Sequence, residues 1–82
     1  MAEISICIPN YNRSKLLKNC LNSIYVSKLK SDLDFEICIS DNASSENVKE
    51  IITEYKNKME IKLNINEKNI GGAANILKVV SM

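Results

Sequence analysis

Polar and apolar residues alternate in three short stretches of the chain, and each stretch predicts a β-strand. The stretches span residues 3–8, 35–39 and 61–65. Strict alternation places one set of side chains on each face of a strand, and the isoleucines in all three stretches favour extended backbone. We expect Pro9 to end the first strand, because proline cannot donate a hydrogen bond to a neighbouring strand. The third strand has one polar face, which indicates a position near an edge of the sheet.

Apolar residues recur at intervals of three and four after each strand, and this spacing predicts three helices. We expect the first over 14–26, the second from about 44 to 58, and the third over 73–82. The three apolar stripes consist of Leu16, Leu17, Cys20, Leu21 and Ile24, then Val48, Ile51, Ile52 and Tyr55, then Ala73, Ile76, Leu77 and Val80.

Polar residues at the start of two of these helices are candidate caps. Ser14 is a candidate N-cap of the first helix, and Ser44 or Ser45 of the second. Glu46 would then lie in the first turn of the second helix, where the helix dipole favours a negative charge.

The alternation of strands and helices predicts the fold class. The order β-α-β-α-β-α requires crossover connections, which join parallel strands and place helices on the faces of the sheet. We therefore expect an α/β fold of three layers, Rossmann-like, with a parallel sheet. No repeat or composition break divides residues 1–82, which predicts a single domain.

Composition and charge narrow the class of protein. Hydrophobic residues make up 45% and charged residues 26% of the chain, as in an ordinary globular domain. The formal net charge is +1 and no basic stripe is visible, so nucleic-acid binding through bulk charge has no support. No apolar run approaches the ~20 residues that span a bilayer, and we predict a cytoplasmic protein without membrane insertion.

Three cysteines, Cys7, Cys20 and Cys38, are widely spaced among apolar neighbours. We expect them to be buried, reduced thiols that pack as small hydrophobic groups. The chain has no histidine and no C-x-x-C motif, so a zinc site is not expected.

Polar segments follow all three predicted strands, over residues 9–13, 40–44 and 66–72. In open parallel sheets, ligands bind beyond the carboxyl ends of the strands. Because these ends meet at one edge, we expect the three segments to form a single site.

Each segment offers a group that a nucleotide needs. Tyr11 supplies a ring face for a base, and Asp41 an acceptor for a ring or ribose donor. Arg13 or Lys68 supplies a countercharge for phosphate. Gly71–Gly72, before a helix, allows close backbone approach and places free N–H groups at a positive helix end.

Simpler interpretations of the same residues remain open at this point. Asp41 and Ser44 are also common turn and cap residues, and a glycine pair is also typical of a turn. Tyr11 is alternatively a loop anchor, and Tyr55 is expected to serve packing. Without histidine, a Ser-His-Asp or Cys-His centre is excluded, and we expect no catalytic residue in the chain.

Three sequence segments, over 4–13, 36–45 and 66–75, resemble in order and spacing the first three strand-loop motifs of the family 2 glycosyltransferases, which have the GT-A fold. The Ser-Asp-Asn-Ala-Ser turn resembles most the bacterial transferases that build surface polysaccharides. The resemblance covers nearly the whole chain.

The resemblance implies roles for the first two loops. Pro9 and Tyr11 would line the base, and Asp41 or Asn42 would hydrogen-bond its edge. Arg13 belongs to the matching motif.

The third motif departs from the family's pattern at one point. By resemblance, residues 69–75 would approach ribose and phosphate, with Gly71 and Gly72 among the donor-binding residues. Family members often carry an arginine there, where this chain has Ala73 and Ala74.

The resemblance also implies a reaction, a donor and a metal. The full-length enzyme would transfer a sugar from a nucleotide-diphosphate donor, most simply of the UDP type, to a polysaccharide or lipid-linked acceptor at the inner face of the membrane. Its Asp-x-Asp motif would hold Mg²⁺ or Mn²⁺ and lies, in the family, after the segment that ends here at Met82. We therefore expect a truncated nucleotide-sugar-binding domain that holds no metal and lacks turnover.

Two further expectations follow. The first strand would form an exposed sheet edge or pair with a second copy, because its outer backbone groups lack a neighbour. The alternative to an enzyme portion is a non-catalytic nucleotide-binding or interaction module with the same α/β fold.

Overall fold

The computed structural model describes residues 4–31 and 34–82, and all six expected elements are present. Glu3, where the first strand was expected to begin, lies outside the described residues. The elements are β1 (Ile4–Asn10), α1 (Ser14–Leu29), β2 (Phe35–Asp41), α2 (Val48–Tyr55), β3 (Ile61–Ile65) and α3 (Gly72–Val80).

The three strands form one parallel sheet in the order β1-β2-β3. Cys7 of β1 lies opposite Cys38 of β2, and Ile37 of β2 lies opposite Ile61 of β3. This arrangement places β1 at one edge and β3 at the other edge of the described sheet, as expected for both strands.

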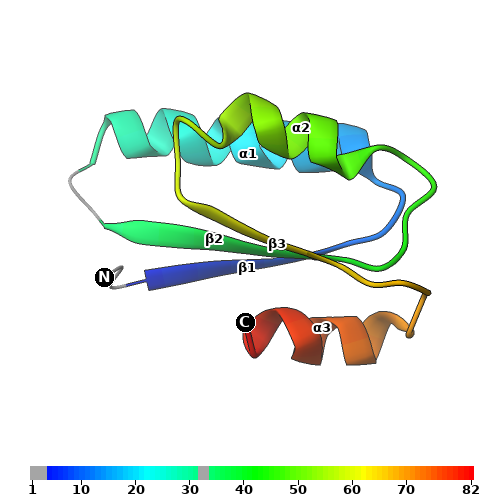
Figure 1. Cartoon of the computed structure of the whole chain (residues 1–82). Coiled ribbons are helices and arrows are strands. Elements are labelled where there is room, and N and C mark those ends of the chain that lie inside the picture. Colours follow the sequence, from blue (N-terminus) through cyan, green and yellow to red (C-terminus); the bar gives the residue numbers. More distant parts are fainter. Residues whose placement is uncertain (1–3, 32–33) are drawn as a thin grey trace.

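The helices cover the sheet on both faces, which confirms the three-layer α/β architecture (Figure 1). Helices α1 and α2 lie side by side on one face, and α3 lies on the other. The main core fills the space between the sheet and the α1–α2 layer. It consists of Leu17, Leu21, Ile37, Ile39, Val48, Ile52, Tyr55, Met59 and Ile61.

Several element boundaries differ from the expectation, and three of the differences have a bearing on the loops or helix caps. Strand β1 continues through Pro9 to Asn10, because a proline is tolerated on an edge strand whose outer side needs no donor. Helix α1 extends to Leu29, three residues beyond the expected end. Helix α2 begins at Val48 and its N-cap is Asn47, whose side chain accepts from the N–H of Glu50 at 3.3 Å, so the cap expected at Ser44 or Ser45 is wrong.

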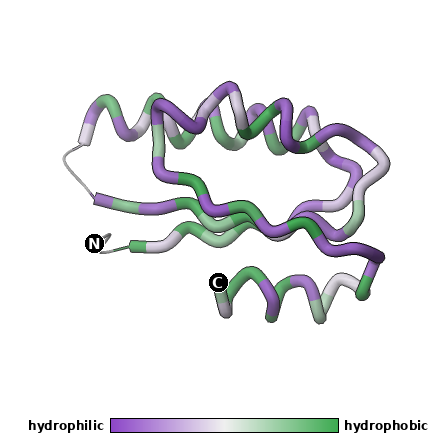
Figure 2. The backbone as a smooth tube through the Cα atoms, in the orientation of Figure 1, coloured by the Kyte–Doolittle hydropathy of each residue, from purple (hydrophilic) through white to green (hydrophobic). Residues whose placement is uncertain are grey.

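The apolar stripe of α3 does not face the sheet. Ile76, Leu77 and Val80 are 51%, 72% and 65% exposed, whereas Asn75 and Val79 are buried. Figure 2 shows hydrophobic positions recurring along α3, with hydrophilic ones between them. The apolar stripe is present in the sequence, but the buried side chain of Asn75 hydrogen-bonds Ser40 and turns a different face of α3 toward the sheet.

The cysteines also differ from expectation. Only Cys38 is buried, and burial raises the pKa of its thiol. Cys7 and Cys20 are exposed, so the expectation of three buried thiols is wrong for both. Cys7 lies on the edge strand β1. Leu16, which belongs to the same expected apolar stripe as Cys20, is 57% exposed.

No helix among the described residues combines the length and the apolar character that crossing a membrane requires.

Candidate functional site

The three polar segments meet at the carboxyl edge of the sheet, as the topology predicts (Figure 1). The N–H of Asn42 donates to the carbonyl of Asn10 at 2.8 Å. The N–H of Asn66 donates to the carbonyl of Asp41, also at 2.8 Å. These two bonds continue the ladders of the sheet by one step and fix the starts of the loops side by side.

Asp41 is the carboxylate at the centre of this edge, and it is only 2% exposed. Its Oδ1 accepts from the side-chain amide of Asn10 at 2.9 Å and from the Ser44 hydroxyl at 2.6 Å. Its Oδ2 accepts from the N–H of Ser44 at 3.0 Å. Asp41 therefore forms the turn that follows β2, which is the simpler interpretation of this residue.

Residues Asn12 and Ala43 have positive φ angles, 46° and 61°. Such backbone is uncommon outside glycine and is held here by side-chain bonds between the first two loops. The N–H of Asn12 donates to Ser44 Oγ, and its side-chain oxygen accepts from the N–H of Ser45, both at 2.8 Å. The first and second loops are thus joined as one unit.

Glu46 ties the same two loops from the other side. Its carboxylate accepts from the hydroxyl of Ser14 at 2.7 Å and from the Ser14 N–H at 3.3 Å. A negative charge is favourable at the first turn of a helix. The prediction that Glu46 lies in the first turn of the second helix is wrong, because its carboxylate stabilises the start of α1. Ser14 is itself the first residue of α1, not its cap.

The side chain of Asn42 connects the second loop to the third. It is 3% exposed and makes four hydrogen bonds. Its amide nitrogen donates to Asn69 Oδ1 at 2.9 Å and to the carbonyl of Gly71 at 3.3 Å. Its oxygen accepts from the N–H of Ile70 at 2.9 Å and from Asn66 Nδ2 at 3.1 Å.

Asn75 anchors α3 to the end of β2. Its amide nitrogen donates to the carbonyl of Ser40 at 2.9 Å, and its oxygen accepts from the Ser40 hydroxyl at 2.8 Å. Asn66 Nδ2 donates to the same oxygen at 3.0 Å, and Asn64 Nδ2 donates to Ser40 Oγ at 2.9 Å. In the described part of the chain, no buried side-chain polar atom is left without a partner.

A pocket of about 300 Å³ opens between the first loop and the start of α3. Arg13 is the one charged residue of its lining. The pocket brings together five of the residues that the sequence singled out: Pro9, Tyr11, Arg13, Asn42 and Gly72. The remaining lining residues are Asn10, Asn75 and Ile76.

Three other sequence candidates lie outside this lining. Asp41 and Gly71 lie behind it, where they hold the second and third loops. Lys68 does not contribute to the pocket lining either. The countercharge for an anionic ligand therefore falls to Arg13.

Gly71 and Gly72 serve different purposes. Gly71 has a φ of 89°, which favours glycine, and its N–H donates to Asn69 Oδ1 at 2.8 Å. Gly72 begins α3, and a Cβ at either glycine would meet no atom within 4 Å. The space beside both glycines is therefore open. The first N–H groups of α3 lack intrahelical partners.

Sequence reasoning missed Asn10 and Asn75, both buried polar residues of the pocket. The asparagine content of the polar segments was the available indication, because buried amides at strand ends usually bond neighbouring loops. Asn75 lay inside a predicted helix, where its burial could not be foreseen.

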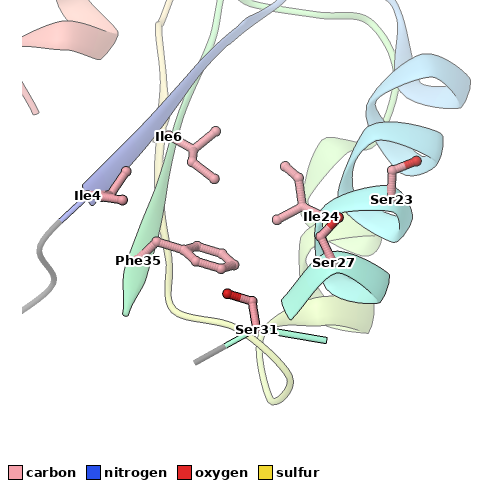
Figure 3. Close-up of a pocket in the computed structure, with 7 residues that line it drawn as sticks. All are labelled: Ile4, Ile6, Ser23, Ile24, Ser27, Ser31 and Phe35. Atoms are coloured by element: carbon pink, nitrogen blue, oxygen red, sulfur yellow. The ribbon is translucent and has the colours of Figure 1, made fainter. Parts of the chain in front are cut away.

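A second hollow, of about 400 Å³, is almost wholly apolar and lies at the opposite end of the sheet (Figure 3). Ile4, Ile6 and Phe35 from the strands point toward Ile24 of α1. None of its described lining residues is charged, and none belongs to the three loops.

The described residues bring no three His, Cys, Asp or Glu side chains together in a group that could hold a metal ion.

The family model for "Glycosyl transferase family 2" matches residues 5–82. This chain belongs to that family. The Salmonella typhimurium abequosyltransferase RfbV is 43% identical over 81 residues, which cover 96% of this chain and 24% of the relative. The Staphylococcus aureus poly(ribitol-phosphate) β-N-acetylglucosaminyltransferase TarS is 31% identical over 72 residues, or 88% of this chain and 12% of the relative. The family 2 chain described here thus spans a quarter or less of these curated relatives.

Solved structures agree with the family assignment. The structure of S. aureus TarS 1-349 in complex with UDP superposes with a TM-score of 0.81 at 28% identity, covering 99% of this chain and 24% of that one. The mannosyltransferase PcManGT from Pyrobaculum calidifontis, in complex with GDP-Man and Mn²⁺, superposes with a TM-score of 0.77 at 18% identity, covering 95% and 23%, and shares the fold.

Proposed function

We propose that this family 2 chain is the nucleotide-sugar-binding portion of a glycosyltransferase that moves a sugar from a nucleotide-diphosphate donor to a polysaccharide or lipid-linked acceptor. The pocket at the carboxyl edge of the sheet carries the proposal. It gathers an aromatic ring, an arginine and an open helix N-terminus around one space. The printed activities of RfbV and TarS, both sugar transferases, support the reaction class.

Each group has a role in donor binding. Tyr11 is 45% exposed and offers its ring to the base beside Pro9. Arg13 pairs with the diphosphate, which a guanidinium binds through charge-assisted hydrogen bonds. Gly72, the first residue of α3, lines the same pocket, and the free N–H groups of a helix N-terminus favour anionic oxygen.

Asp41 has a narrower role in the proposal than its charge suggests. It is 2% exposed and lies outside the pocket lining, and its carboxylate already accepts from Asn10 and Ser44. Its role in the proposal is therefore to hold the turn beside the pocket rather than to contact the base. The TarS complexes with UDP and UDP-GlcNAc support a donor of the UDP type.

The metal belongs to the whole transferase in this proposal. Mg²⁺ or Mn²⁺ would stabilise the departing diphosphate. The described residues hold no group of acidic ligands, so none of them is assigned to the metal.

Pairing of two copies of the chain through the edge strand β1 also stays a prediction.

A titration of the chain with UDP, followed by amide chemical shifts, tests the proposal. We expect shifts at Tyr11, Arg13 and Gly72, and none near the apolar hollow at Phe35. Replacing Arg13→Gln should weaken UDP binding by at least about ten-fold, because a charge-assisted hydrogen bond contributes about 1.5–3 kcal/mol. Uridine, which lacks phosphate, should bind wild type and Arg13→Gln equally.

Lys56→Gln is the matched control, since it removes one exposed positive charge at the end of α2, away from the pocket. It should leave UDP affinity unchanged. A chain that shows no shift at Tyr11, Arg13 and Gly72 with UDP would refute nucleotide binding at this site.

A further inference from the structure

The side chain of Asn42 has no hydrogen-bonding capacity left for a ligand. An amide donates two hydrogen bonds and accepts two at its oxygen. Asn42 uses all four within the protein, at distances from 2.9 to 3.3 Å, and is 3% exposed. Although it lines the pocket, a base edge could bond to this amide only by displacing an existing partner.

All four bonds run to one segment, residues 66–71. Two of them end on backbone groups, the N–H of Ile70 and the carbonyl of Gly71. A third ends on Asn69, whose oxygen also accepts from the N–H of Gly71. Asn42 therefore fixes the backbone directly before α3, including the one glycine with a positive φ.

The same backbone sets where α3 begins. The Gly71 carbonyl accepts from the N–H of Asn75 at 3.1 Å, so it belongs to the first turn of the helix. A shift of Gly71 would move Gly72, which lines the pocket. The position of the open N–H groups thus depends on the Asn42 amide.

We infer that Asn42 is a positioning residue: it holds residues 66–71 so that the start of α3 faces the nucleotide, and its own side chain does not read the base. The inference rests on the proposed function and deepens it. It assigns the preference for the base to other groups of the pocket.

Amide hydrogen exchange without nucleotide tests the positioning itself. In Asn42→Ala, exchange at Ile70 and Gly71 should accelerate at least about ten-fold, because both amides lose a direct or indirect partner. Exchange at Ile37, whose N–H donates to the Glu60 carbonyl in the sheet, should not change. Unchanged exchange at Ile70 and Gly71 would overturn the inference whether or not the chain binds nucleotide.

Asn42→Asp serves as a second variant of nearly the same shape. A carboxylate keeps both acceptors and loses both donors. The bond from the Ile70 N–H should survive, whereas those to Asn69 and to the Gly71 carbonyl should be lost. We expect Ile70 to stay protected and Gly71 to exchange faster.

Affinities for UDP and CDP then separate positioning from base reading, since the two bases differ at the edge that a side chain would bond. Asn42→Ala should weaken both nucleotides by the same factor, about five-fold or more, at a temperature where the protein is folded. A changed ratio of UDP to CDP affinity would show that Asn42 reads the base and would overturn the inference. Unchanged affinities would do so too, by leaving Asn42 only a role in stability.

Asn47→Ala is the matched control, because Asn47 also loses a side-chain bond to backbone but caps α2 away from the pocket. It should lower stability without changing either affinity or exchange at Ile70. If wild type binds neither nucleotide, the proposed function fails, while the exchange experiment still decides the role of Asn42.

Discussion

Side-chain amides join the three loops of this site, and their chemistry explains why. One asparagine offers two donors and two acceptors, so it bridges two loops without bringing a charge into a buried place. Asn42 and Asn75 do this with 3% and 2% exposure. Asp41 is the exception, and its carboxylate is surrounded by donors from Asn10 and Ser44.

The replacement Asp41→Asn should therefore destabilise the chain by about 1–3 kcal/mol. The new amide nitrogen would face the N–H of Ser44, which leaves two donors opposed in a buried turn. Urea unfolding measures the change in the free energy of unfolding. Asp34→Asn, at an exposed position before β2, is the control and should stay within about 0.5 kcal/mol. Equal stability of the two variants would show that the Asp41 carboxylate is not needed for the turn.

At this scale the sequence supported the turn role of Asp41 and the packing role of Tyr55, which is 4% exposed. It did not support a structural role for Asn75, because a helix pattern treats every asparagine as a surface residue. The partner that reverses this, the backbone of Ser40, lies 35 positions away in the chain. Only the folded arrangement brings the two together.

Among the elements, α3 shows how hydrogen bonds can orient a helix against its own apolar stripe. Val79 packs on the sheet beside the anchored Asn75, while Leu77 and Val80 face outward. The hydrophobic pattern correctly predicted a helix here, with an expected range of 73–82 that starts one residue late and ends two residues beyond Val80. It gave the wrong buried face, since periodicity cannot weigh a buried polar anchor against exposed leucine.

The two glycines at the start of α3 should respond oppositely to replacement by alanine. Gly71→Ala places a Cβ at a φ of 89°, which should cost about 1–2 kcal/mol even though the Cβ meets no atom. Gly72→Ala keeps a helical backbone and should raise stability by about 0.4–1 kcal/mol through the unfolded state. Thermal unfolding of both variants measures the difference. Equal destabilisation by the two replacements would contradict this account.

A polar rung joins the three strands and should give a pH-dependent contribution. Ser5 and Lys62 hydrogen-bond the Glu36 carboxylate at 2.7 and 3.0 Å. These bonds lower the pKa of Glu36 below its ordinary 4.5, and Glu36 raises the pKa of Lys62 above its ordinary 10.5.

The lowered pKa means that the Glu36 contribution is present above pH 4.5 and is lost as the pH falls through the lowered pKa. The Lys62 contribution is present below pH 10.5 and is lost as the pH rises through the raised pKa. Glu36→Gln should thus lower the melting temperature at pH 7. The difference in melting temperature from wild type should disappear as the pH falls through the lowered pKa of Glu36. Glu54→Gln, from the half-exposed Lys18–Glu54 pair at 3.6 Å, should have a smaller effect at pH 7. A Glu36→Gln gap that does not change with pH would exclude an ionic origin.

For the whole molecule, alternation of strands and helices was enough to predict the parallel sheet, its layers and the edge at which the loops meet. The rule that ligands bind beyond carboxyl ends then located the pocket. The sequence could not distinguish the residues that line the pocket from those that hold the loops around it. Tyr11 and Arg13 line the pocket, whereas Asp41 and Gly71 lie outside its lining. That distinction depends on which polar atoms already form hydrogen bonds within the protein.

The strand order β1-β2-β3 is also the order of synthesis, and this has a consequence for how the sheet assembles. Register partners such as Cys7 and Cys38, or Ile37 and Ile61, are separated by one helix and its loops. Closing chain segments of this length costs little more entropy than closing shorter ones. As they leave the ribosome, β2 therefore meets β1, and β3 meets β2, each already synthesised. The sheet can grow in one direction from β1, as the chain itself does.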